Sequence, residues 1–179
     1  KEAGLVTYYA PMVAADFARE NGVDLPSWRH CFAGEPAWSF GQAEGLRVLR
    51  PGVAEGRLDG GCLSILAEAL GTPYAPAIPQ GSILFLEDIG TKPYQWDRML
   101  LHLRYAGLLD HARGIVFGNM RQCVAAGEAE FLDRAILHAL GAFDGPIAIG
   151  LRSVHVESAN VTVPLGLQVR LDLADGMNP

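Results

Sequence analysis

Short segments of alternating or continuous apolar residues recur along the chain and predict β-strands. Residues 4–9 (GLVTYY) combine aliphatic and aromatic side chains that favour the pleated backbone. In the tail, apolar residues occupy every second position from Leu167 to Leu173, so one face of that strand is expected to be buried. The predicted strands are 4–9, 46–52, 82–90, 114–119, 145–151 and 165–176, with a shorter extended piece at 56–61.

Between these strands, apolar residues spaced three or four apart predict helices. The strongest pattern lies in 92–112, where Trp96, Leu100 and Leu103 share one stripe and polar residues take the far side. The predicted helices are 12–20, 62–70, 92–112 and 129–143. Because strands and helices interleave, the pattern predicts an α/β or α+β fold with a mixed sheet.

Composition and charge narrow the class of protein. The chain has 179 residues, of which 50% are hydrophobic and 19% charged, a globular composition for one domain or for one domain and part of another. The net charge is −6 without a basic block, so we expect no nucleic-acid partner. No apolar run reaches the roughly 20 residues of a membrane-spanning helix, and the N-terminus lacks the pattern of a signal peptide. We therefore expect no membrane partner.

Cysteine usage indicates compartment and cofactors. Three widely spaced cysteines (Cys31, Cys62 and Cys123) fit reduced thiols in the cytoplasm better than a disulfide framework. No CxxC, HxH or HExxH spacing occurs, and we expect neither a metal nor another cofactor.

Glu87 and Asp88 stand where the apolar run 83–86 (ILFL) ends. Alternation places Phe85 and Glu87 on one face of the strand. Glu87 is either a carboxylate held at a cleft or a solvated edge residue, whereas Asp88 has the better position to cap a following segment.

Among the five histidines, His155 has a distinct position. His102 and His138 lie on predicted helix surfaces, His111 follows a helix end, and His30 has no partner nearby in the sequence. His155 follows an apolar strand in a loop, where catalytic groups are commonly mounted. The alternative is a loop histidine bonded to a backbone carbonyl, and the pattern alone leaves both open.

A glutamate and a histidine on neighbouring strand ends would form the orienting part of a nucleophilic triad. A nucleophile is harder to find. There is no GxSxG motif, and Ser64 lies within a predicted helix. Cys62 follows a glycine pair at a helix start, where a thiol can be activated, but the pattern favours the alternative of a small buried residue packed under a tight turn.

Three segments together resemble the C-terminal half of the LD-carboxypeptidases, also called muramoyltetrapeptide carboxypeptidases and related to the microcin C immunity peptidases. They are GRLDGGCLSILAEALGTPY, then ILFLEDIGTKPYQWDRMLLHLRYAGLLDHARGIVFGN, then HVESANVTVPLG, and the likeness extends over about residues 4 to 173. GLVTYYAPMV resembles the strand that closes the family's Rossmann-like N-terminal domain.

The resemblance implies a domain division and residue roles. Residues 1–40 would be the tail of the N-terminal domain plus a linker that carries Trp28 and Trp38, and 41–179 would be the C-terminal domain, a swivelling β/β/α unit. Glu87 and His155 would be catalytic, with Glu87 orienting His155. The serine would lie upstream of Lys1, so this chain alone is expected to be inactive.

Two positions depart from the family pattern. Val154 stands where glycine usually precedes the histidine, and Cys62 replaces the asparagine of GGNLS. A valine would restrict the loop if the family's glycine uses a positive φ.

The expected activity is removal of the terminal D-alanine from murein tetrapeptides in cell-wall recycling, by a cytoplasmic serine peptidase. Its partners would be the murein peptide, its own N-terminal domain and a second copy in a homodimer. Two alternatives stay open. One is an immunity-type peptidase that cleaves aminoacyl-nucleotide antibiotics, in which a tryptophan could stack on the purine. The other is a non-catalytic binding module.

Overall fold

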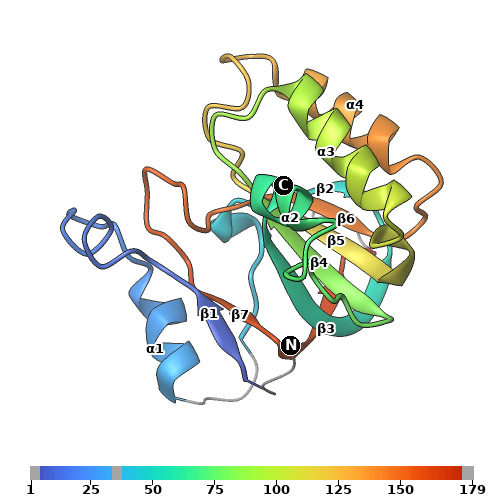
Figure 1. The fold of residues 1–179 in the computed structure, drawn as a ribbon. Coiled ribbons are helices and arrows are strands. Elements are labelled where there is room, and N and C mark those ends of the chain that lie inside the picture. The colour runs from blue at the N-terminus through green and yellow to red at the C-terminus, as the bar shows by residue number, and fades with distance from the viewer. Residues whose placement is uncertain (1–4, 34–37, 175–179) are drawn as a thin grey trace.

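A computed structural model describes residues 5–33 and 38–174 of the chain (Figure 1). Parts of three predicted segments lie outside the described residues: position 4 of the first strand, positions 34–37 of the linker and positions 175–176 of the last strand. The strands are β1 (Thr7–Tyr9), β2 (Arg47–Arg50), β3 (Val53–Cys62), β4 (Ser82–Glu87), β5 (Ala112–Gly118), β6 (Ile147–Leu151), β7 (Val163–Leu165) and β8 (Gln168–Asp172). The helices are α1 (Leu25–Ala33), α2 (Leu63–Ala69), α3 (Pro93–Tyr105) and α4 (Ala129–Leu140), with 3₁₀ turns at Gln42–Glu44 and Leu109–His111.

Six strands form one sheet in the order β2-β6-β5-β4-β3-β8. The four inner strands, β3 to β6, run parallel, whereas β2 and β8 pair antiparallel at the two edges. The prediction of a mixed sheet with interleaved helices is therefore confirmed. The carboxyl ends of the four parallel strands meet at one edge, where ligand sites of α/β sheets usually lie.

Two hydrophobic layers lie on the two faces of this sheet. Helices α2, α3 and α4 cover one face (Figure 1), and there Leu84 and Leu86 of β4 pack in the same cluster as Trp96 of α3. Ile83 and Phe85 point to the other face and join a second cluster. The alternation predicted for this strand is thus observed, and it places Glu87 on the face of Phe85.

The face opposite the helices is covered by a separate two-stranded ribbon. In it, β1 pairs antiparallel with β7, with Tyr8 opposite Pro164. Val163 and Leu165 of β7 pack in the second hydrophobic cluster together with Tyr9 of β1. The ribbon thus brings an N-terminal segment next to the carboxyl end of β4, at the edge of the sheet that bears Glu87.

Two sequence predictions in the N-terminal part are wrong. The helix expected at 12–20 is a series of turns, because Met12, Val13 and Phe17 stay largely exposed and give a helix no apolar face to bury. The linker expected to carry Trp28 and Trp38 is not irregular throughout, since it contains α1. The Asp24 side chain accepts a hydrogen bond from the Ser27 backbone N–H at 2.8 Å, which starts that helix.

Within the described residues, no helix has the length and apolar character needed to cross a membrane.

Candidate functional site

Glu87 is the last residue of β4 and lies at the carboxyl edge of the parallel strands. It is 1% exposed, although its side chain carries a carboxylate. In the neighbouring strands, Cys62 is its partner in β3. Gly118 of β5 also lies beside it, because a Cβ added there would stand 2.7 Å from the Glu87 Cβ. A buried carboxylate requires hydrogen-bond donors, and two side chains supply them.

His155 supplies the first donor. It lies in the loop between β6 and β7, and its Nδ1 stands 2.9 Å from Glu87 Oε2. The Glu87 side chain is 2% exposed, whereas that of His155 is 30% exposed. With Nδ1 carrying the proton that it donates to Glu87, Nε2 is the unprotonated ring nitrogen. Among the described residues, Nε2 has no hydrogen-bond partner.

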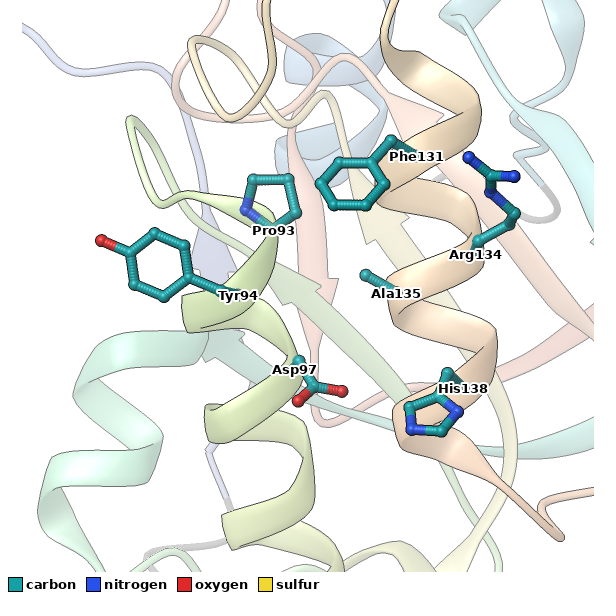
Figure 2. Close-up of a pocket in the computed structure, with 7 residues that line it drawn as sticks. All are labelled: Pro93, Tyr94, Asp97, Phe131, Arg134, Ala135 and His138. Carbon is teal, nitrogen blue, oxygen red and sulfur yellow. The ribbon is translucent and has the colours of Figure 1, made fainter.

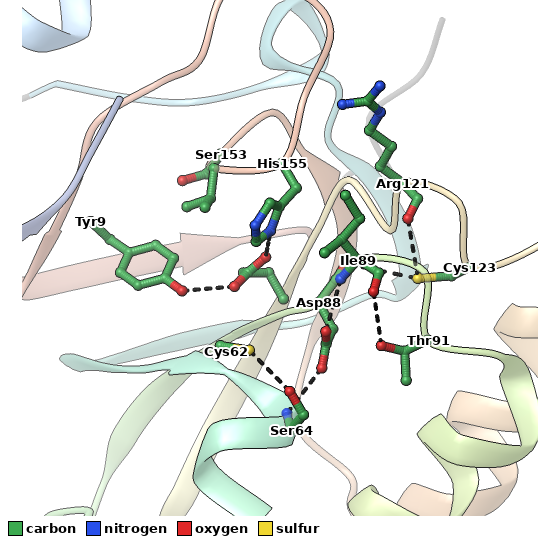
Figure 3. Close-up of polar contacts among 12 residues, drawn as sticks. Tyr9, Cys62, Ser64, Asp88, Ile89, Thr91, Arg121, Cys123, Ser153 and His155 are labelled. Carbon is green, nitrogen blue, oxygen red and sulfur yellow. Dashed lines mark hydrogen bonds and ion pairs between the residues drawn. The ribbon is translucent and has the colours of Figure 1, made fainter. Parts of the chain in front are cut away.

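Tyr9 of β1 supplies the second donor, and sequence reasoning did not identify it. Its hydroxyl donates to Glu87 Oε1 at 2.7 Å, so both carboxylate oxygens are bonded (Figure 3). The Tyr9 ring packs edge-on against Phe85, with the centroids 5.6 Å apart. Burial, followed by the hydrogen bond to Glu87 and the negative charge of Glu87, raises the Tyr9 pKa far above its ordinary value. The hydroxyl therefore remains a donor at neutral pH.

Asp88 points away from this pair and stabilises a helix. Its Oδ2 accepts a hydrogen bond from the backbone N–H of Ser64, in the first turn of α2, at 3.0 Å. Its Oδ1 accepts a hydrogen bond from the backbone N–H of the next residue, Ile89, at 2.9 Å. Asp88 thus caps a helix, but the prediction that it caps a following segment is wrong, because α2 precedes it in the chain. Cys62 ends β3 directly before this helix, with its Sγ 3.3 Å from Ser64 Oγ (Figure 3).

The backbone before His155 has an unusual conformation. Val154 has φ +70°, in the left-handed region that favours glycine. The position thus does use a positive φ, and the valine there is strained, as expected from the sequence for that case.

The other four histidines take no part in the site. His102 and His138 are exposed on α3 and α4, as expected. His111 Nδ1 lies 2.7 Å from the carbonyl oxygen of Ile78, and the His30 ring packs 5.2 Å from the ring of Trp38.

The surface is hollowed beside the His155 loop and also between α3 and α4. The first hollow has a volume of roughly 460 Å³, and Arg121 in it donates to Glu157 at 2.8 Å. The other, of roughly 380 Å³, lies between α3 and α4 and includes neither Glu87 nor His155 (Figure 2). It is lined by Pro93, Tyr94, Asp97, Phe131, Arg134, Ala135 and His138. Across residues 5–33 and 38–174, no group of three or more potential ligands among His, Cys, Asp and Glu could hold a metal ion.

Comparison with known proteins gives concordant matches. Residues 55–171 match the family model of the LD-carboxypeptidase C-terminal domain. A probable murein peptide carboxypeptidase from Bacillus subtilis is 32% identical over 98% of this chain and 56% of its own length. The crystal structure of a muramoyltetrapeptide carboxypeptidase from Oxalobacter formigenes is 29% identical, with a TM-score of 0.75 over 98% of this chain and 60% of that one.

A third match shares the fold at lower identity. The structure of MccF in complex with glutamyl sulfamoyl guanosine is 20% identical, with a TM-score of 0.84 over 98% of this chain and 60% of that one. The chain thus spans little more than half the length of the proteins that it resembles.

Proposed function

The chain belongs to the LD-carboxypeptidase family, and from this premise we propose that it provides the histidine and glutamate of a serine carboxypeptidase acting on murein peptides. The observation that carries the proposal is the 2.9 Å hydrogen bond between His155 Nδ1 and Glu87 Oε2 at the carboxyl edge of the sheet. A binding module without chemistry has no need of a buried carboxylate paired with a half-exposed imidazole.

In the proposed mechanism, His155 acts as a general base and then as a general acid. Nε2 accepts the proton of a serine hydroxyl as its oxygen attacks the carbonyl carbon of the terminal peptide bond. The imidazolium then gives that proton to the nitrogen of the departing D-alanine. Water next attacks the acyl-enzyme ester, again losing a proton to Nε2, and the peptide acid leaves as the serine recovers its proton. Glu87 keeps the proton on Nδ1 and stabilises the positive charge in each cycle.

The serine and its domain are part of the proposal. The 56% coverage of the Bacillus subtilis relative supports a longer enzyme, and we propose that a segment preceding this domain carries the nucleophile. We propose that residues 1–40 join that segment to a C-terminal domain at 41–179. Cytoplasmic location and a homodimer remain predictions.

The hollow beside the His155 loop supports a substrate with a free carboxylate. Arg121 lies in it and is paired with Glu157, whose side chain is 79% exposed. An arginine with an exposed carboxylate partner can exchange it for the terminal carboxylate of a peptide through two parallel hydrogen bonds. Recognition of that carboxylate is what distinguishes a carboxypeptidase from an endopeptidase.

The test is release of D-alanine from a murein tetrapeptide by the full-length enzyme. Glu87→Gln and His155→Ala should each lower kcat at least about 100-fold, since each removes part of the acid–base system. Glu68→Gln and His102→Ala are matched controls, because both side chains are exposed on helices, and they should retain full activity. Unchanged activity in both site variants would contradict the proposal. Release by residues 1–179 alone would identify an internal nucleophile, and Cys62 would be the first residue to replace.

An immunity-type peptidase is the second candidate, and one observation favours it. The Trp38 side chain is 43% exposed and lies beside His30, so an aromatic face is available for stacking on a purine. Cleavage of an aminoacyl nucleotide, with no release of D-alanine and a loss of activity in Trp38→Ala, would establish this function in place of the first.

A further inference from the structure

Val154 occupies a backbone conformation that a valine avoids. A φ of +70° brings its branched Cβ close to the backbone, and such strain persists only where the surroundings impose it. His155 is the next residue, so the direction of its side chain depends on this conformation. The contacts of Val154 show what imposes it.

Asn160 holds both backbone polar groups of Val154. Its Oδ1 accepts the Val154 N–H at 2.7 Å, and its Nδ2 donates to the Val154 carbonyl at 3.1 Å. Asn160 is fully buried, and its own backbone is tied to a neighbouring segment by hydrogen bonds to Gly22 and from Asp24. The backbone of Asn160 is therefore fixed in place, and its side-chain amide holds the N–H and the carbonyl of Val154 by two hydrogen bonds.

Asp16 sets the orientation of that amide. Its Oδ2 accepts the second Nδ2 proton of Asn160 at 2.9 Å and the backbone N–H of Met12 at 2.7 Å. The carboxylate is 1% exposed and also forms an ion pair with Arg19. An Asn amide beside a carboxylate can present only its nitrogen, so its oxygen is left for Val154.

Arg19, the ion-pair partner of Asp16, contacts the loop on the C-terminal side of His155. Its guanidinium donates to the carbonyl of Val156 at 3.1 Å. Turn residues that precede α1 therefore hold the His155 loop before and after the histidine.

We propose that Asn160, oriented by Asp16, holds Val154 in the left-handed conformation and so keeps His155 in hydrogen-bond contact with Glu87. Both are positioning residues, and their importance for turnover rests on the function proposed above. A glycine at position 154 adopts the same φ without strain. The need for Asn160 should therefore depend on the side chain at 154.

The test is a double-mutant cycle read by NMR on the His155 Nδ1 proton, whose resonance lies far downfield while it is bonded to Glu87. Asn160→Ala should lose this resonance or shift it upfield. Val154→Gly should keep it, and Asn160→Ala/Val154→Gly should regain it. In the full-length enzyme, kcat should fall about 10- to 100-fold in Asn160→Ala with KM within about twofold, and should recover to within about threefold in the double variant.

Gln122→Gly is the matched control. Gln122 has φ +59° at an exposed position in the loop between β5 and α4, so glycine there relieves the same kind of strain in a different loop. Asn160→Ala/Gln122→Gly should not regain the resonance. If Asn160→Ala does not fold, Asn160→Ser replaces it.

Three outcomes would overturn the proposal: an unchanged resonance in the Asn160 variant, rescue by Gln122→Gly equal to that by Val154→Gly, or no rescue by Val154→Gly. The NMR pattern as expected with no change in D-alanine release would uphold the positioning and overturn the proposed function instead.

Discussion

At the scale of single residues, the buried Glu87 carboxylate is satisfied by two donors of different kinds. His155 donates from a ring nitrogen, whereas Tyr9 donates from a hydroxyl that keeps its proton well into the alkaline range, because burial and Glu87 raise its pKa. The tyrosine therefore fixes one oxygen of Glu87 regardless of what happens at the histidine. This arrangement leaves Glu87 Oε2 pointed at the imidazole of His155.

Replacement of Tyr9 by phenylalanine should lower the free energy of unfolding by about 1.5 kcal/mol. This value is the lower end of the usual contribution of a hydrogen bond to a charged group, and it applies because Tyr9 is only half-buried. Urea denaturation at pH 7 measures it. Tyr74→Phe is the control, because Tyr74 is 86% exposed and its loss should leave stability unchanged. Equal stability of Tyr9→Phe and the wild type would show that the Glu87 hydrogen bond contributes nothing.

The raised pKa of Tyr9 predicts that the stability difference between the wild type and Tyr9→Phe depends on pH in the alkaline range. The folded-state pKa of Tyr9 is raised, chiefly by burial, above its ordinary value near 10. Above about pH 10 the unfolded chain loses this proton while the folded chain retains it, so the Tyr9 contribution is complete below pH 10 and declines above it. The stability difference between wild type and Tyr9→Phe should therefore shrink as pH rises from 9 to 11. A constant difference in urea titrations over that range would rule this out.

At the scale of elements, the end of β4 is shaped by the strands on either side. Gly118 in β5 is needed because any Cβ there meets the Cβ of Glu87. Gly114 in the same strand faces the flexible ends of Ile83 and Leu171, each 3.0 Å from an added Cβ. Substitution of Gly118 therefore tests the contact with Glu87, whereas substitution of Gly114 tests the packing of the sheet alone.

Gly118→Ala should separate Glu87 from His155, because a Cβ fixed to the backbone cannot move without a shift of the strand. We expect about 1 to 3 kcal/mol of destabilisation in both Gly118→Ala and Gly114→Ala. Only Gly118→Ala should also lower kcat/KM at least about tenfold, since small misplacements of catalytic groups are costly. Activity loss of the same size in Gly114→Ala would mean that general sheet stability, and not the Glu87 contact, controls the rate.

Asp88 should contribute to stability through α2. Asp88→Ala removes the acceptor for the Ser64 N–H and should lower the free energy of unfolding by about 1 to 2 kcal/mol, as for other helix caps. Asp144→Ala, at an exposed carboxylate, is the control for chemical denaturation. An Asp88→Ala variant as stable as this control would show that the bond does not support the helix.

The sequence predicted the elements whose pattern is local. The α3 helix has a long apolar stripe, and β4 is a continuous apolar run, so both were found with nearly correct starts. Their ends were placed too late, since α3 ends at Tyr105 and not at 112, and β4 ends at Glu87 and not at 90. The strand β7 was missed because it has three residues and contains Pro164. The start of α1 had a signal in Asp24 and Ser27 that the surrounding glycines and prolines obscured.

At the scale of the whole molecule, the site combines three distant parts of the chain. Glu87 and His155 could be predicted because each lies at the end of an apolar segment and matches a family motif. Tyr9 could not, because its role depends on the pairing of β1 with β7, and no local pattern reports that pairing. The turns at 12–20 were mistaken for a helix for the same reason, since Asp16 bonds to Asn160, 144 positions away.

The distances along the chain within this site have a consequence for synthesis on the ribosome. Tyr9 is separated from Glu87 by 78 positions, and Glu87 from His155 by a further 68. The strand β7 that holds Tyr9 in place emerges later still. A nascent chain therefore has to hold the β1 segment and the carboxylate of β4 unpaired until almost the whole domain has left the exit tunnel. Proteolysis of stalled nascent chains should find the region before α1 open to cleavage until β7 has appeared.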